Sequence, residues 1–351
     1  MTSSPEPRRG VHRPEVSIAL QTDKTPAAYA ELAAAAEHAG FDGVSVFADL
    51  GFQPPGPALT TIAAHTHAVR LGVACHSPAY THPVDIAAQV ATLDLFSGGR
   101  AYCGLARGAW LDGLGIPDAG GLDRLAESVT VIRALLDGDD RGFTGRHLQL
   151  PRGFRLNGTL PEQRPPMLIG TWGRRTARMA GELGVEEVKI GGSANPAMTA
   201  LMRSWLPPAV RLVVGAVTVC DPDPDVARTL ARQQVCLYLD VVGALDPTVG
   251  IAPTLLAGLR SFVTSGDTEA AAELVSEELL DAFTFAGTAD QIAAHARACL
   301  AAGADRIEFG TPHGPDPVRG VELLGSVLPQ IRSAAAAAGT GAAAPRAGWR
   351  R

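Results

Sequence analysis

The sequence predicts an α/β fold, specifically a (β/α)8 TIM barrel with a helical insertion between its seventh and eighth strands. Short apolar segments alternate with longer amphipathic segments along most of the chain. This alternation supplies eight strands, the number that a closed parallel barrel needs. Residues 221–302, between the seventh and eighth strands, are far more than one crossover connection requires, so we expect an insertion there.

Composition favours one soluble barrel domain. Apolar residues make up 46% of the 351 residues, enough for a large core, and no apolar run is long enough to span a bilayer. The net charge of −6, without a basic block, argues against nucleic acid as a partner. Residues 1–14 lack an apolar signal segment, and residues 334–351 are rich in Ala and Gly, so we expect flexible ends around a barrel domain of residues 15–333.

The cysteines are odd in number and scattered, without the paired spacing of a zinc site or a disulfide framework. This pattern is typical of a reducing compartment and predicts a cytoplasmic protein. The five are Cys75, Cys103, Cys220, Cys236 and Cys299.

The first half of the chain supplies four strands, each followed by a helix. The first helix begins at Pro26 and carries apolar residues at helical spacing until Gly40, which ends it. The expected strands are residues 16–20, 44–48, 71–75 and 102–106, and the later helices are residues 57–69, 84–96 and 122–136.

The second half continues the alternation after a loop over residues 138–166. The expected strands are residues 167–172, 185–190, 212–219 and 306–309. Within the insertion, residues 225–242 and 269–280 are the clearest helices, and the glycines at positions 266 and 287 mark breaks.

Polar residues and glycines gather where the predicted strands end. Barrel enzymes place their sites at the C-terminal ends of the strands, so these residues are the candidates. They are Asp49 after the second strand; Ala74, Cys75 and His76 at the third; Arg107, Gly108 and Trp110 after the fourth; Gly170, Thr171, Trp172, Gly173, Arg174 and Arg175 at the fifth; Lys189, Gly191, Gly192 and Ser193 at the sixth; and His313 after the eighth.

Two arginines open the helix that follows the fifth strand. Arg174 and Arg175 would oppose the helix dipole, and a bound anion would reverse that cost. With Gly173 and Lys189 they could hold a phosphate or carboxylate. The alternative is that both arginines point to solvent, where a charge costs little.

The histidines and tryptophans have two interpretations each. His76 and His313 have no metal-ligand spacing, so we expect no metal, and each histidine could be a structural hydrogen-bonding residue or a proton donor. Trp110 and Trp172 could stack on a planar ring or pack in the core.

Several phrases, in this order and spacing, carry a resemblance that covers residues 16–328. They are AEHAGFD at residues 36–42, ATLDLFSGGR at 91–100, GLARG at 104–108, IGTWG at 169–173 and AGELG at 180–184. The chain resembles the bacterial luciferase-like superfamily of flavin and deazaflavin enzymes. Residues 187–196 and the phrase EFGTPHG at 308–314 look most like its methylenetetrahydromethanopterin reductase-like branch, which uses coenzyme F420.

This resemblance implies that the strand ends hold a deazaflavin ring. A bulge with a non-proline cis peptide, here at Ala74 to His76, would back the ring, and Asp49 would lie near it. Arg107 and Gly108 would flank the other side. The loops after the fifth and sixth strands, with Gly170, Thr171, Trp172, Gly173, Arg174, Lys189, Gly191, Gly192 and Ser193, would take the phosphate tail.

The resemblance further predicts an F420-dependent oxidoreductase that transfers hydride from reduced deazaflavin to a C=N or C=C bond of a small molecule. Asp49, His76 and His313 are the candidates for handling a proton. The alternatives are a monooxygenase that uses reduced FMN, and a barrel that binds flavin without catalysis. Leu50 and Ala109 stand where the sugar-phosphate dehydrogenase branch has a histidine and a glutamate, which argues against that reaction.

Two helices, residues 57–69 and 84–96, carry little charge. Their apolar surface predicts a homodimer formed through them, unless the insertion or the tail covers these helices.

Overall fold

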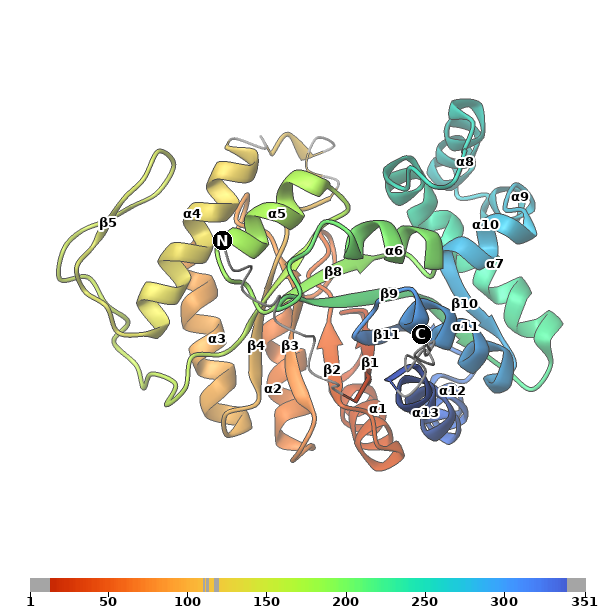
Figure 1. Cartoon of the computed structure of the whole chain (residues 1–351), viewed down its shortest axis with the longest axis horizontal. Helices are drawn as coiled ribbons and strands as arrows, with labels where there is room; N and C mark the ends of the chain where they lie inside the picture. The colour runs from red at the N-terminus through yellow and green to blue at the C-terminus, as the bar shows by residue number, and fades with distance from the viewer. Residues whose placement is uncertain (1–12, 110, 112–113, 117–119, 340–351) are drawn as a thin grey trace, which may run out of the picture.

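Eight parallel strands form a closed barrel. The strands lie in the middle of the molecule, with helices around them (Figure 1). The computed structural model describes residues 13–109, 111, 114–116 and 120–339. Each strand pairs with the next along the chain, β1 also pairs with β11, and β8 pairs with β9, so that no gap remains in the circle. The prediction of a (β/α)8 barrel is thereby confirmed. The barrel strands are β1 (Glu15–Leu20), β2 (Gly43–Val46), β3 (Arg70–His76), β4 (Ala101–Leu105), β7 (Met167–Gly170), β8 (Glu187–Gly191), β9 (Arg211–Cys220) and β11 (Arg306–His313).

Helices surround the barrel and bury their apolar faces against the strands. Several begin with proline in the first turn, which lacks an amide hydrogen that the helix would leave unpaired there. Gly40 ends the first helix as predicted, in the left-handed conformation with φ 86°. The surrounding helices are α1 (Pro26–Ala39), α2 (Pro55–Ala64), α3 (Pro83–Ser97), α4 (Gly121–Leu136), α5 (Arg174–Glu182), α6 (Pro196–Arg203), α11 (Ala289–Ala301), α12 (Pro317–Ser326) and α13 (Leu328–Gly339).

The prediction that a helix covers residues 57–69 is wrong at its end. Helix α2 stops at Ala64 because the following backbone groups bond to other partners. The Glu37 carboxylate accepts hydrogen bonds from the amides of residues 67–69, and the Arg100 guanidinium donates to the carbonyl oxygens of Ala63, Thr66 and Val69. These two distant side chains hold the segment as a turn.

The segment between β9 and β11 contains several helices, which Figure 1 shows gathered at one side of the barrel. They are α7 (Pro224–Val242), α8 (Pro253–Ser265), α9 (Thr268–Glu273) and α10 (Glu277–Phe283), followed by strand β10 (Thr284–Gly287). Helix α7 matches the predicted range closely. The single helix predicted over residues 269–280 is two, since the Ser276 side chain caps a new helix.

Strand β10 was not predicted. It pairs with the C-terminal end of β9. Its four residues are too few to show the alternation of apolar and polar residues that identifies a strand. The inserted helices share a second apolar core, to which Val235, Leu239, Leu259, Leu280 and Phe283 belong.

Helix α13 continues beyond residue 333, where the barrel domain was predicted to end and the tail to begin. The rest of that tail, the first twelve residues and Trp110 lie outside the described residues. In the part of the chain that the structure describes, no helix has both the length and the apolar character needed to cross a membrane.

Candidate functional site

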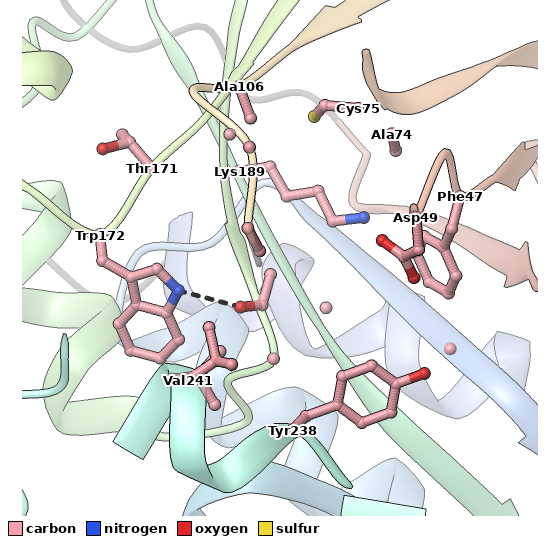
Figure 2. A pocket seen from close by; sticks show the side chains of 18 of the residues that line it. Phe47, Asp49, Ala74, Cys75, Ala106, Thr171, Trp172, Lys189, Tyr238 and Val241 are labelled. Atoms are coloured by element: carbon pink, nitrogen blue, oxygen red, sulfur yellow. Dashed lines mark hydrogen bonds between the residues drawn. The ribbon is translucent and has the colours of Figure 1, made fainter. Parts of the chain in front are cut away.

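A cavity of about 610 Å³ lies at the C-terminal ends of the barrel strands (Figure 2). Residues in or just after β2, β3, β4, β7, β8, β9 and β11 form its sides, and α7 of the insertion contributes a further wall. Most of the predicted cofactor-binding residues line it: Asp49, Ala74, Cys75, Arg107, Gly108, Gly170, Thr171, Trp172, Gly173, Lys189, Gly191 and Gly192.

The two predicted histidines do not line this cavity. His76 lines a separate cavity of about 220 Å³ between α2 and α3, and the His313 ring is fully buried, 3.0 Å from the Phe309 carbonyl oxygen. Burial lowers the pKa of each to about 4. Both rings are therefore uncharged at neutral pH and away from the cavity, which does not support the predicted proton-handling role.

Two further predicted residues also lie off the cavity lining. Arg174 is exposed at the start of α5, and Ser193 is buried, with its hydroxyl accepting a hydrogen bond from the Asn195 amide at 3.2 Å. Arg174 is thus free to face solvent or an anion, while Ser193 shapes the loop into α6.

Asp49 and Phe47, which both follow β2, line one side of the cavity. Gln21 donates a hydrogen bond to its carboxylate at 2.9 Å. Burial raises the pKa of Asp49 above its ordinary value, although Gln21 and the nearby Lys189 oppose the shift. This carboxyl keeps a proton to higher pH than an exposed aspartate does.

The bulge predicted in β3 is present. The register of β3 against β4 shifts between Val73 and His76, and the Ala74–Cys75 peptide bond is cis. Gly104 lies against this bulge, and a Cβ added there would be 2.2 Å from the Val73 carbonyl oxygen. Burial raises the pKa of the Cys75 thiol to about 12, so Cys75 presents an uncharged thiol to the cavity at neutral pH.

Lys189 is paired inside the barrel. Its ammonium donates to the Glu308 carboxylate, whose other oxygen accepts from Ser45 at 2.6 Å, and Ser45 bonds Tyr102 at 2.6 Å. Burial alone would raise the pKa of Glu308, but Lys189 and Arg306 lower it overall. Because Glu308 compensates the charge of Lys189, the predicted use of this lysine for a phosphate is not supported.

The family description luciferase-like monooxygenase matches residues 9–306. The chain belongs to this family. The 5,10-methylenetetrahydromethanopterin reductase of Archaeoglobus fulgidus is 27% identical to this luciferase-like protein over 85% of the chain and 93% of the relative. An F420-dependent glucose-6-phosphate dehydrogenase of Nakamurella multipartita is 28% identical over 88% of the chain and 93% of the relative.

The solved structure of the coenzyme F420-dependent tetrahydromethanopterin reductase from Methanopyrus kandleri has the same fold. It superposes with a TM-score of 0.79 at 23% identity, covering 90% of this chain and 98% of that one. The resemblance read from the sequence is confirmed at the level of family and fold.

Sequence reasoning missed several residues of this luciferase-like site. Glu308 belonged to a quoted phrase but received no role. The sequence did contain a pattern that could have identified Glu308. The strands at 187–191 and 306–313 each carry two charged residues at alternate positions, and alternate residues of a barrel strand face the same side, here the barrel interior. Tyr80 and Tyr238 also line the cavity, and burial together with the Asp49 charge raises the pKa of both phenols, that of Tyr80 to about 12.

A second layer of charges lies deeper in the barrel. Glu187 is bonded by Arg306 at 2.8 Å and by Arg70 at 3.2 Å, while Arg211 lies 3.4 Å away. Arg70 and Arg211 also pair with Glu15, at 3.2 and 2.7 Å, so each of these charges has an opposite partner, which indicates a structural role. Among the described residues, no cluster of His, Cys, Asp and Glu is arranged to hold a metal.

Helix α7 forms the remaining wall. Val235, Tyr238, Val241 and Val242 face the cavity from this helix. Trp172 packs beside the wall, with its indole N–H donating to the Gly191 carbonyl oxygen at 3.0 Å (Figure 2) and its ring 6.4 Å from that of Phe283. The indole is therefore fixed as a rigid side of the cavity.

Proposed function

We propose that this protein is an F420-dependent oxidoreductase that transfers hydride from reduced deazaflavin to a C=N or C=C bond of a small molecule. The observation that carries the proposal is the cavity at the strand ends, lined by Ala74 and Cys75 of the β3 bulge and by Asp49. Its family includes relatives named as F420-dependent enzymes, one of them a reductase of a pterin cofactor.

The cavity lining fits a planar ring. A Cβ added at Gly191 or Gly173 would meet only side-chain atoms 3.8 Å away, so the space beside these backbones is open to a ligand. Gly108 has φ 104° and packs against Ser77, which holds the backbone after β4 at the cavity edge. The volume of the cavity lies within the range of about 300–1,000 Å³ that is typical of small-molecule sites.

Reduced deazaflavin supplies the hydride when it is bound. Asp49 lines the cavity and is placed to give the proton that must join the second atom of the reduced double bond, and burial raises its pKa, which favours the protonated form. The Lys189–Glu308 pair keeps this part of the lining close to neutral, and α7 adds an apolar wall.

The anionic tail of the cofactor is assigned to the start of α5 and the loop after β8. Arg174 and Arg175 are exposed there, Gly173 caps the helix, and Gly192 adopts φ 82°. A phosphate at this position would pair with the arginines and the free amides of the first turn.

Binding and turnover test the proposal in sequence. The purified protein is titrated with oxidised F420 and, separately, with FMN, following fluorescence quenching. Reduced F420 is then mixed with electron-poor imines and enones, and return of the oxidised absorbance is recorded. We expect F420 binding and substrate-dependent oxidation; binding of FMN alone would defeat the proposal.

A reduced-FMN monooxygenase is the second candidate, because the family description itself names that activity. Oxygen consumption with reduced FMN and an oxidisable substrate would favour it. Binding of F420 without oxidation by any acceptor would favour the third candidate, a non-catalytic flavin-binding barrel.

We further propose a cytoplasmic homodimer formed through α2 and α3. Leu95 and Phe96 on α3 are 55% and 56% exposed, and all five cysteines are unpaired, which suits a reducing compartment. Sedimentation of wild type and Phe96→Asp tests the dimer: the variant should be monomeric, and an unchanged mass would contradict this interface.

A further inference from the structure

The wall that α7 contributes to the cavity is apolar, although α7 itself carries many charges. Arg228 pairs with Glu277 and Asp281, Arg232 pairs with Glu277, and Arg260 binds Asp240 at 3.4 Å. All of these pairs lie among the inserted helices and outside the cavity lining. The face turned to the cavity instead carries Val235, Val241 and Val242, as Figure 2 shows for Val241.

This apolar face continues beyond the helix. Leu245 lines the cavity and remains 46% exposed, and the Phe283 and Trp172 rings complete the same side. Val235 and Phe283 are already buried in the second apolar core, whereas Val241 is half-buried and Leu245 is exposed. An apolar ligand would stabilise the latter two side chains by removing their remaining surface from water.

The charged groups of the lining lie at the strand ends, and the innermost are compensated. Lys189 is paired with Glu308, and Asp49 accepts from Gln21. Arg107, at the end of β4, is the other cation of the described lining. The α7 side has a single polar group near them: Tyr238, which shares a hydrogen bond with Gln21 and interacts with Asp49.

From this division we infer that the substrate is an uncharged, largely apolar molecule with one hydrogen-bonding end. The apolar body packs on Val241, Leu245 and Trp172, and a carbonyl-type end meets Asp49 and Tyr238, both of which bond Gln21. A phosphate group bound against the α7 wall would set its charge against the valines, at a large desolvation cost. The inference rests on the proposed function, because it assigns the substrate side of the same cavity.

Equilibrium dialysis tests this directly, without cofactor turnover. The apolar probe is duroquinone, whose fully methylated ring offers no free position to a thiol, and the charged probe is glucose 6-phosphate, named in the activity of one relative. We expect wild type to bind duroquinone and not glucose 6-phosphate. Tight binding of the phosphate, or no binding of duroquinone, would overturn the inference.

Three variants locate the binding surface. Val241→Asp should weaken duroquinone binding about tenfold or more, because it sets a charge against the ligand. Val226→Asp is the matched control on the same helix, since Val226 is 43% exposed and lies off the cavity. Val241→Thr keeps the side-chain shape and should fold even if the aspartate variant does not. Its affinity for duroquinone should lie between those of wild type and Val241→Asp. Equal affinity in Val241→Thr and wild type would overturn the assignment of Val241.

Titration of the same samples with oxidised F420 separates the two proposals. Duroquinone binding without F420 binding supports this inference and removes the proposed cofactor. F420 binding without duroquinone binding overturns this inference and leaves the proposed function intact.

Discussion

At the side of the cavity, Gln21 holds the Asp49 carboxylate at 2.9 Å while burial raises the pKa of that carboxyl. We predict that Asp49→Asn lowers turnover about a hundredfold, the usual size of a general acid contribution. The protonated form of Asp49 is lost as the pH rises through its raised pKa, so wild-type kcat/KM should fall at pH values above that pKa. The Asn variant should lack this limb, which a pH series of kcat/KM measures.

Asp23 offers the matched control for this prediction. It lies after β1, and its side chain is 48% exposed. Asp23→Asn should leave both turnover and the pH profile near those of wild type, and full activity of Asp49→Asn would show that the proton comes from elsewhere.

The buried Lys189–Glu308 pair gives a second prediction at the residue scale. Glu308→Gln leaves an uncompensated ammonium in the barrel and should lower the free energy of unfolding by about 3–5 kcal/mol. Adding Lys189→Met removes that charge, so the double variant should be more stable than the sum of the single changes predicts. Urea unfolding of the four proteins measures the coupling.

The exposed pair Arg319–Glu322 serves as the control for the buried one. Its side chains are 61% and 55% exposed, so Glu322→Gln should cost less than about 1 kcal/mol. Additive losses at Lys189 and Glu308 would contradict the interpretation of the pair.

Among the elements, the bulge in β3 depends on its neighbour β4. A Cβ at Gly104 would meet the Val73 carbonyl oxygen at 2.2 Å, far inside contact distance. Gly104→Ala should therefore lower the free energy of unfolding by about 1–3 kcal/mol and disturb the cavity floor. Thermal unfolding and F420 titration measure the two effects.

Gly56 in α2 is the control, because nothing lies within 4 Å of a Cβ added there. Gly56→Ala should be neutral or stabilise by up to about 1 kcal/mol, through loss of unfolded-state freedom. Wild-type stability in Gly104→Ala would mean that β3 can move away from β4 at little cost.

The position of α7 over the cavity depends on another contact between elements. Asn195, before α6, donates to Asp246 at 2.9 Å and to Thr248 at 2.8 Å in the loop that follows α7. Asp246 is only 2% exposed. This buried contact holds the end of α7 near the loop after β8, so the apolar wall and the proposed tail site are fixed together.

For the whole molecule, buried histidines predict how stability depends on pH. Burial lowers the pKa of His76 and His313 to about 4, from 6.5 in the unfolded chain. Unfolding binds protons below pH 6.5, so stability should fall as pH falls from 6.5 to about 4. The loss can reach about 3 kcal/mol for each histidine, since one pKa unit corresponds to about 1.4 kcal/mol.

Denaturant unfolding across this pH range measures the effect. His313→Asn should flatten the fall, because asparagine tolerates the φ of 75° at this position and carries no titrating ring. His67→Gln, at an exposed position, should leave the curve unchanged. The lowered pKa values of Glu187 and Glu308 add to the loss below pH 4.5, whereas the raised pKa of Asp49 opposes it.

Much of the barrel could be predicted because most strands are short apolar segments that alternate with longer amphipathic helices. Asp49, Cys75 and the glycines from 170 to 192 reached the cavity because a strand end fixes where the next residue lies. The end of α2 could not be predicted, since Glu37 and Arg100 stop it from other elements.

The sequence by itself determined the number and order of the barrel strands and the end of the barrel at which a site would form, because these depend on local periodicity. Only the tertiary structure decided that His76 and His313 point away from the cavity, that Glu308 compensates Lys189, and that α7 supplies an apolar wall. The physical reason is that side-chain direction after a bulge, charge pairing across a barrel and the docking of an inserted helix all depend on contacts between residues far apart in the chain.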